Sequence, residues 1–244
     1  MILLRRRALT GGDMPSPGRG QGQGRGRGPT PGGSAAGDLL VGQTVAIKES
    51  GTPIPYLVVH QGNPDAGLYD ASCEGTWLLR NEIVTMKIYG SSRFYVDSGM
   101  PFYLNPDIAG TPLSGLDEKI KNAMKTVKIP YHASTGRIMS GGNGLTCKAF
   151  ILSPREYGDS LSSMPSDGVP LAYFRAGGAA NRIAYYNGEP KRHWTRSDNL
   201  NSSSVWVVLE SGAISALNRT NEYGIRTAFI LPYGYQFEES EVIA

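Results

Sequence analysis

Histidine and cysteine are the first side chains to test for chemistry, because they supply many of the nucleophiles, general bases and metal ligands of proteins. The chain has His60, His132 and His193, together with Cys73 and Cys147. These five residues are far apart in the sequence and follow no metal-ligand spacing. We therefore expect three hydrogen-bonded structural histidines and two free, buried thiols, with one disulfide between the cysteines left open.

Motifs for catalysis, metal binding and nucleotide binding give no stronger lead. The chain contains no G-x-S-x-G elbow, no H-E-x-x-H helix and no P-loop. Residues 20–28 have glycines at dinucleotide-binding spacing, but no strand precedes them and no helix follows. For calcium, the nearest candidate is Asn187-Gly-Glu-Pro190. The sequence thus predicts a protein that is not an enzyme and has no cofactor or metal.

Another set of side chains suits recognition rather than catalysis. Two segments near the C-terminus are rich in Asn, Ser, Asp and Tyr, which binding surfaces favour and which are also typical of ordinary turns. Their composition predicts that both segments are exposed. We predict that the ligand-binding residues are Asp198, Asn199, Asn201, Ser202, Ser203, Asn218, Asn221 and Tyr223.

Four short strands are expected to position these segments, over residues 193–197, 203–210, 213–217 and 224–231. The second strand is apolar on both faces, which predicts a central place in its sheet. Ser211-Gly212 predicts a hairpin turn between the second and third strands. In an antiparallel hairpin the start of one strand lies beside the end of its partner. The loops 198–203 and 218–223 should therefore meet at one end of the sheet.

The rest of the chain predicts an α+β fold with a small twisted antiparallel sheet, one or two helices and long loops. Glycine accounts for 32 of the 244 residues, which excludes a coiled coil and most helix bundles. Strands are expected over residues 41–47, 54–60, 76–89 (straight or bent) and 145–152. A helix is expected to begin at Ser114 as N-cap, to continue along an apolar stripe to Val127, and to end before Pro130.

The first 37 residues differ in charge and composition from the rest. They hold six arginines and one aspartate, whereas the remaining chain is close to neutral, and the net charge is +3. Residues 11–37 have no periodic apolar residue, which predicts a flexible arm that packs on nothing. We expect an arm over residues 1–37 and a folded domain over 38–244. No run approaches the roughly 18 apolar residues of a membrane span, and the N-terminus is not a secretory signal.

Five stretches of the sequence occur in an order that is typical of one family. They are Trp77 with its apolar run, Tyr103-Leu-Asn105, Ala149-Phe-Ile-Leu-Ser-Pro-Arg-Glu156, His193-Trp-Thr-Arg-Ser197 and Gly224-Ile-Arg-Thr-Ala-Phe-Ile-Leu231. Together, over residues 40–232, they resemble a bacterial and phage domain-of-unknown-function family with W-L-R-S, G-V-R-P-A and F-L-L-S-x-x-E signatures. The chain departs from these signatures at Thr195, Asp198 and Thr227, where the family has Leu, Pro and Pro.

This resemblance implies a C-type-lectin-like fold, related in architecture to formylglycine-generating enzymes. It also implies that Arg196 and Arg226 are buried scaffold residues rather than ligand contacts. Formylglycine-generating relatives need a reactive cysteine pair, whereas Cys73 and Cys147 lie in unrelated segments.

The resemblance and the loop composition together predict a display protein of a phage or prophage virion, in the tail or in receptor binding. Its loops, which a retroelement could diversify, would bind a bacterial cell-surface protein or glycan. The arm would join it to virion tail proteins, and a homo-oligomer is possible. The protein would be made in the host cytoplasm, without membrane insertion. Two alternatives stay open: a host-encoded module for an unknown ligand, and a less favoured nucleic-acid contact through the Gly-Arg-Gly-Arg stretch of the arm.

Overall fold

Two β-sheets form the centre of the part that the computed structural model describes, residues 33–175 and 177–243. The six-stranded sheet has the order β10 (Ala149–Ile151), β17 (Thr227–Leu231), β4 (Thr76–Arg80), β3 (Thr52–Gln61), β2 (Thr44–Glu49) and β19 (Val242–Ile243). The five-stranded sheet has the order β15 (Ile214–Leu217), β14 (Val205–Val208), β13 (His193–Asp198), β16 (Glu222–Ile225) and β5 (Thr85–Ile88). All neighbours are antiparallel except β13 and β16, which are parallel.

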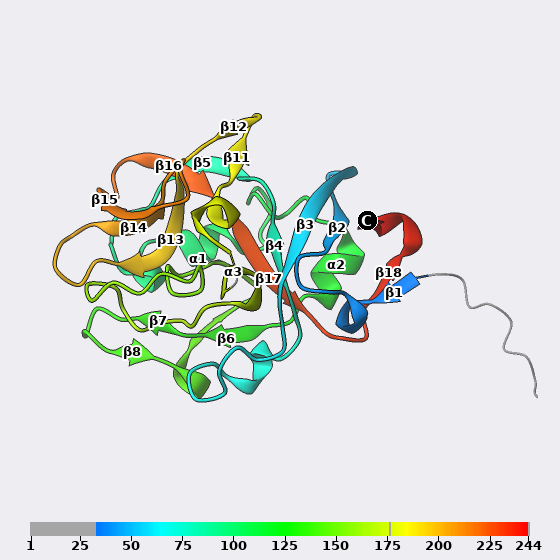
Figure 1. Ribbon diagram of the computed structural model, residues 1–244, viewed down its shortest axis with the longest axis horizontal. Coiled ribbons are helices and arrows are strands. Elements are labelled where there is room, and N and C mark those ends of the chain that lie inside the picture. Colours follow the sequence, from blue (N-terminus) through cyan, green and yellow to red (C-terminus); the bar gives the residue numbers. More distant parts are fainter. Residues whose placement is uncertain (1–32, 176, 244) are drawn as a thin grey trace, which may run out of the picture. The chain divides into compact units, whose positions relative to one another are not determined.

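Short elements surround the sheets (Figure 1). The paired strands are β1 (Gly33–Ala35) with β18 (Gln236–Glu238), β6 (Val127–Ile129) with β9 (Leu145–Cys147), β7 (Tyr131–His132) with β8 (Ile138–Met139), and β11 (Tyr185–Tyr186) with β12 (Glu189–Pro190). The helices are α1 (Met100–Tyr103), α2 (Glu118–Ala123) and α3 (Ala172–Arg175), and the 3-10 turns are η1 (Ala36–Asp38), η2 (Ala71–Cys73), η3 (Tyr95–Asp97), η4 (Gly141–Asn143), η5 (Ala179–Arg182) and η6 (Glu239–Glu241). The described chain is therefore mostly β-sheet with a few short helices. None of the described helices is long and apolar enough to cross a membrane.

The chain passes from one sheet to another at three places where the sequence predicts a single strand. Residues 76–89 form β4 in the larger sheet and β5 in the smaller one. Residues 224–231 contain the end of β16 and all of β17, with Arg226 alone between them. Residues 145–152 divide at Lys148 into β9 and β10. The prediction of one continuous strand was wrong for 145–152 and 224–231, whereas the bend foreseen in 76–89 is a change of sheet.

Strands β10, β17 and β4 of the larger sheet are buried on both faces, whereas β2 is buried on one face only. Side chains alternate between the two faces along each strand. Trp77 and Leu79 of β4 belong to a core cluster shared with the smaller sheet, which contributes Trp194. Leu78 belongs to a second cluster on the opposite face, where α2 contributes Ile120. Because each face has its own apolar layer, β4 is an almost continuous apolar run rather than an alternating one.

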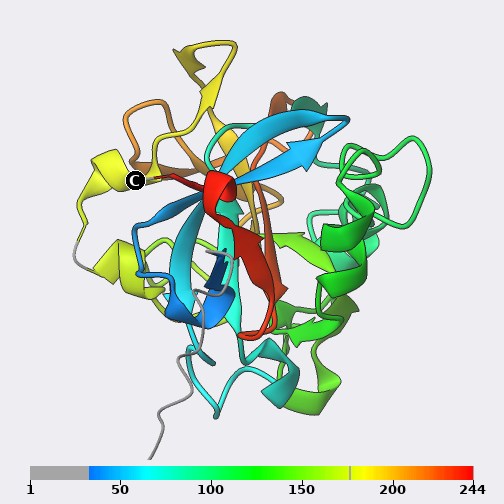
Figure 2. The ribbon, with the colours of Figure 1, turned by 90° about the vertical axis from the view of Figure 1, so that its right-hand side faces the viewer.

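The folded unit begins before Asp38, where the sequence places the end of the flexible arm. Gly33–Ala35 pair with β18, and Ala36 is fully buried. Figure 2 looks onto this side, where the C-terminal segment in red lies beside the first described residues in blue. The backbone oxygen of Ala36 accepts hydrogen bonds from Gln61 and Thr76. Main-chain pairing, which composition does not reveal, therefore orders residues 33–37; the rest of the arm lies outside the described residues.

The predicted helix is real but shorter, and its cap is different. Helix α2 begins at Glu118, and the Asp117 carboxylate accepts a hydrogen bond from the Lys119 amide as N-cap. Ser114 instead donates its hydroxyl to the Thr111 carbonyl, so the expected N-cap at Ser114 was wrong. The apolar stripe extends beyond the helix because Val127 continues into the core from strand β6.

The predicted hairpin between β14 and β15 is present. Val205 lies opposite Leu217, and β14 lies between two other strands of its sheet. Gly212 in the turn has φ of 80°, and an added Cβ would lie 1.8 Å from the Ala179 carbonyl oxygen. Glycine is required here both for its positive φ and for this close approach.

Candidate functional site

The loops predicted to bind ligand leave the β14–β15 hairpin at the same end, because Val205 pairs with Leu217. We call residues 199–203 and 218–221 the loop face. Its exposed predicted residues are Asn201, Ser202, Ser203, Asn218 and Asn221, while Asn199 is half-buried. Sequence reasoning missed Leu200, an apolar side chain 42% exposed in the first loop. The geometry thus brings the two predicted loops together on one accessible surface.

Two asparagines of the loop face hold the loops in shape. The Asn199 side-chain oxygen accepts from the Asn201 amide at 2.9 Å. The Asn218 side-chain oxygen accepts from the amide and the hydroxyl of Thr220, both at 3.0 Å. Such Asx turns fix a loop locally without distant contacts. No side-chain hydrogen bond is recorded for Asn201 within the described chain, so its side chain is free to meet a partner.

Tyr223 joins the loop face to the core. Its ring lies 4.8 Å from the Trp194 ring, centroid to centroid, and its hydroxyl accepts a hydrogen bond from Asn221 Nδ2 at 2.8 Å. The side chain is half-buried in β16. Tyr223 therefore supports the second loop from beneath and presents only part of its surface.

Asp198 is buried, and the expectation that it is exposed was wrong. It is 1% exposed at the end of β13, and its Oδ1 lies 2.7 Å from Nδ1 of His132 on β7. With the carboxylate oxygen as acceptor, the His132 ring donates from Nδ1. The His132 ring in turn packs against Phe94 at 5.7 Å. Asp198 thus ties β13 to β7 at the base of the first loop, through a partner 66 residues away in sequence.

Arg93 holds the first loop from outside the sheet, and sequence reasoning did not find it. Its Nη1 donates to the backbone oxygens of Asn199 and Ser202, and its Nε lies 3.6 Å from Asp198 Oδ2. The guanidinium also stacks 4.8 Å from the Phe94 ring centroid. The only signal in the sequence is the aromatic pair Phe94-Tyr95 that follows this arginine. Arg93 and Asp198 together fix the backbone of the loop, and the exposed Ser202 hydroxyl accepts a further hydrogen bond from the Ser204 amide at 3.2 Å.

Arg196, in strand β13 of the five-stranded sheet, is the centre of a buried polar cluster. Its guanidinium donates to both carboxylate oxygens of Glu156, at 2.5 and 2.7 Å, and to the carbonyls of Pro130, Ile151 and Asp167. Glu156 also accepts from the Tyr69 hydroxyl and the Ser153 amide. With side chains of both partners completely buried, this pair is structural. The predicted burial of Arg196 is confirmed.

Asp167 completes this cluster. Both of its carboxylate oxygens accept from the Ser197 hydroxyl, at 2.9 and 2.7 Å. Burial raises the pKa of Asp167 to about 6, because desolvation disfavours the charged form. The carboxyl therefore titrates close to neutral pH inside the fold.

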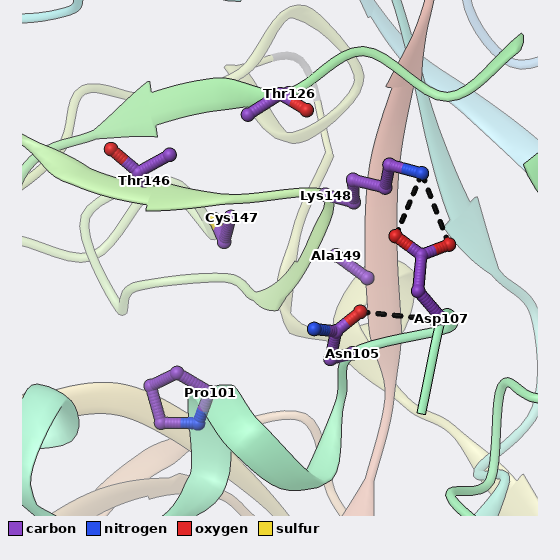
Figure 3. A pocket seen from close by; sticks show the side chains of 8 residues that line it. All are labelled: Pro101, Asn105, Asp107, Thr126, Thr146, Cys147, Lys148 and Ala149. Atoms are coloured by element: carbon purple, nitrogen blue, oxygen red, sulfur yellow. Dashed lines mark hydrogen bonds and ion pairs between the residues drawn. The ribbon is translucent and has the colours of Figure 1, made fainter. Parts of the chain in front are cut away.

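A small polar pocket of about 230 Å³ lies beside Lys148 (Figure 3). Lys148 Nζ points to the two carboxylate oxygens of Asp107, at 3.0 and 2.8 Å, so these charges neutralise each other. Cys147 also lines the pocket, and burial raises the pKa of its thiol to about 12. Such a thiol stays protonated at neutral pH and is a poor nucleophile. Both Cys147 and Cys73 are free thiols.

The three histidines have separate structural surroundings. His60 Nδ1 accepts from the Ala172 amide, and His193 Nε2 lies 3.2 Å from the Tyr157 hydroxyl. Burial, followed by the charge of Arg226, lowers the pKa of His193 to about 3. Among residues 33–175 and 177–243, no group of three or more His, Cys, Asp or Glu side chains could hold a metal ion.

Comparison with known proteins gives one match. A family model described as a domain of unknown function (DUF6273) matches residues 74–233. This range contains the loop face, Arg93, Arg196 with Glu156 and Asp167, and Arg226. It leaves out Tyr69 and strands β2, β3 and β19 of the larger sheet. No curated protein and no solved structure matches the chain.

Proposed function

Because the chain belongs to the DUF6273 family of domains of unknown function, we propose its function from its own geometry: a non-catalytic binding domain that displays the loop face. One observation carries this proposal. Two polar loops lie together at one end of the five-stranded sheet. The half-buried Arg93 holds the backbone of the first loop, and the buried pair of Asp198 and His132 anchors its base. Rigid support with exchangeable exposed side chains lowers the entropy cost of binding.

The proposal extends to the partner and the setting. The ligand is a bacterial cell-surface protein or glycan, recognised by Asn201, Ser202, Ser203 and Asn221 around the exposed Leu200. The fold is C-type-lectin-like, in keeping with the small sheets, short helices and long connections of the described chain. The protein is a display component of a phage or prophage virion, joined to tail proteins by its N-terminal arm. A gene neighbourhood without tail genes or a reverse transcriptase would favour the host-encoded alternative.

Binding to cells and glycans tests the loop face directly. Labelled full-length protein is incubated with a panel of bacterial strains and with a glycan array. The variant Asn201→Ala/Ser203→Ala/Asn221→Ala should bind its target at least about tenfold more weakly, because it removes three polar side chains that the proposal assigns to ligand contact. The change at Asn221 also removes the hydrogen bond to the Tyr223 hydroxyl.

The matched control is Thr52→Ala/Ser211→Ala, which alters two exposed polar residues outside the loop face, one at the start of β3 and one in the turn between β14 and β15. It should bind like the unaltered protein. Equal binding by the triple variant, or no binding of the unaltered protein to any cell or glycan, would contradict the proposal. Thermal unfolding of each variant confirms that binding is compared between folded proteins.

A further inference from the structure

A second pocket, of about 480 Å³, opens where the two sheets meet. Strands β2 and β3 line one side, α3 and η5 another, and β11 lies at its edge; these elements are labelled in Figure 1 except η5. The innermost charged residue of the lining is Arg226, which connects β16 to β17. The volume is in the range of sites for small molecules. It is separate from the loop face, with which it shares no residue.

Arg226 is a buried cation without an acidic partner. The residue is only 3% exposed. Its Nε donates to the Arg80 carbonyl at 2.8 Å and its Nη1 to the Arg182 carbonyl at 3.4 Å, and the Tyr157 hydroxyl is a further neighbour. Within residues 33–175 and 177–243, no carboxylate oxygen lies within 4 Å of its guanidinium. Carbonyls and a phenol accept some of its five N–H donors but do not neutralise its charge.

Two other buried arginines, unlike Arg226, each have an acidic partner. Arg196 is paired with Glu156 through two hydrogen bonds, and Arg80 is paired with Glu49. Taking a charge out of water is costly unless an opposite charge compensates it. Arg226 is held in place without that compensation, and burial lowers its pKa accordingly.

The groups around the pocket leave the positive charge unopposed at its inner end. Glu82 lines the pocket but is exposed to solvent. Arg182 turns its guanidinium to Asp159 instead. The rest of the lining includes aromatic rings and amides, among them Tyr185 and Asn181. Rings of this kind contact an organic ligand, while amides and the guanidinium donate hydrogen bonds to it.

We propose that this pocket binds a small organic anion, whose carboxylate or phosphate group pairs with Arg226. The guanidinium presents N–H donors in a planar fork that matches both groups. The ligand supplies the negative charge that the fold does not. Arg226 is then both a structural residue at the junction of the sheets and a ligand contact.

Three probes of similar size distinguish the contribution of ligand charge to binding from that of ligand shape. They are benzoate, phenyl phosphate and the neutral benzamide. Binding to the full chain is followed by protein-observed NMR and by thermal stabilisation at millimolar probe concentrations. At least one anion should bind roughly tenfold or more tightly than benzamide, because a charged hydrogen-bond pair is lost with the neutral probe. The better anion distinguishes a carboxylate ligand from a phosphate ligand.

Two variants locate the site without disturbing the buried guanidinium. Asn181→Asp places a negative charge in the lining and should weaken anion binding by roughly tenfold. Asn187→Asp makes the same change in the exposed turn between β11 and β12, outside the lining, and should bind like the unaltered protein. Arg226→Gln should abolish the preference for anions where the variant remains folded.

The proposal is overturned if neither anion binds better than benzamide, or if Asn181→Asp and Asn187→Asp bind the anion equally well. NMR shifts confined to residues outside the pocket would also overturn it. In each of those cases Arg226 is a scaffold residue only. None of these outcomes affects the loop-face experiment, because the two sites share no residue.

Discussion

Replacing Glu156 with glutamine tests the buried cluster most sharply. The substitution keeps the shape of the side chain but removes the charge that compensates Arg196, whose side chain is completely buried. It also places an amide N–H₂ where an oxygen now accepts hydrogen bonds from Arg196 and either Tyr69 or Ser153. Breaking a buried ion pair in this way costs about 3–5 kcal/mol. That is a large part of the roughly 5–15 kcal/mol by which a domain is stable.

Urea unfolding followed by tryptophan fluorescence measures this loss. Trp77, Trp194 and Trp206 are each at most 4% exposed, so their emission reports loss of the core. The matched control is Glu210→Gln, because Glu210 pairs with Arg192 in an ion pair whose side chains are 43% and 39% exposed. An exposed pair of this kind contributes about 0–1 kcal/mol.

The two variants should therefore differ by at least about 2 kcal/mol in the free energy of unfolding. If Glu156→Gln loses less than about 1 kcal/mol, or no more than Glu210→Gln, the carboxylate does not compensate Arg196 as described. An unchanged dependence of the free energy on urea concentration shows that both variants unfold from the same compact state.

Three further predictions concern the cluster, the core and the loop face. Burial raises the pKa of Asp167 from 3.8 to about 6, so the folded state binds that proton more tightly than the unfolded state does. Lowering the pH from about 7 to about 4 should therefore stabilise the unaltered protein relative to Asp167→Asn by roughly 2–3 kcal/mol, and equal pH dependence of the two proteins in urea titrations would contradict this. Trp206→Ala should lower the free energy of unfolding by roughly 3–5 kcal/mol, whereas a loss under about 1 kcal/mol would place the ring at the surface. In thermal unfolding, Asn218→Ala should cost about 1 kcal/mol through the lost hydrogen bonds to Thr220, and Asn201→Ala should stay within about 0.5 kcal/mol; equal effects would refute the distinction between loop-forming and free side chains.

The position of most strands could be predicted from sequence, but not the sheet to which each belongs. Apolar and β-branched residues mark residues 54–60, 203–210 and 213–217 as strands, and strands lie there. The segments 145–152 and 224–231 each change sheet at one residue, Lys148 or Arg226. In both segments, apolar residues before and after the change of sheet pack in the same core, so the apolar pattern of the sequence continues through the change. Periodicity reports burial, and burial does not distinguish one sheet from its neighbour.

The candidate site was predictable to the extent that it depends on local turns. Hairpin geometry predicts that the loops 198–203 and 218–223 meet at one end of the sheet, and the pairing of Val205 with Leu217 agrees with this. Asp198 and residues 222–223 belong to strands rather than to the loops. Composition fails at Asp198, because an aspartate in a polar stretch is equally able to be exposed or to pair with a distant residue. Its partner, His132, is 66 residues away, and Arg93 reaches the same loop from a third segment. Contacts of this kind depend on the tertiary fold and leave no local signal.

Two short stretches of the sequence, Ser153–Glu156 and Arg196–Ser197, build the buried cluster and contribute nothing to the loop face. The Glu156 carboxylate accepts a hydrogen bond from the Ser153 amide, and the Ser153 hydroxyl accepts one from the Glu156 amide. The same carboxylate pairs with Arg196. Ser197, beside that arginine, holds Asp167. Ser153 with Glu156 and Arg196 with Ser197 are thus two halves of one polar network inside the fold. None of these residues belongs to the loop face, so its exposed side chains can be exchanged without altering this network.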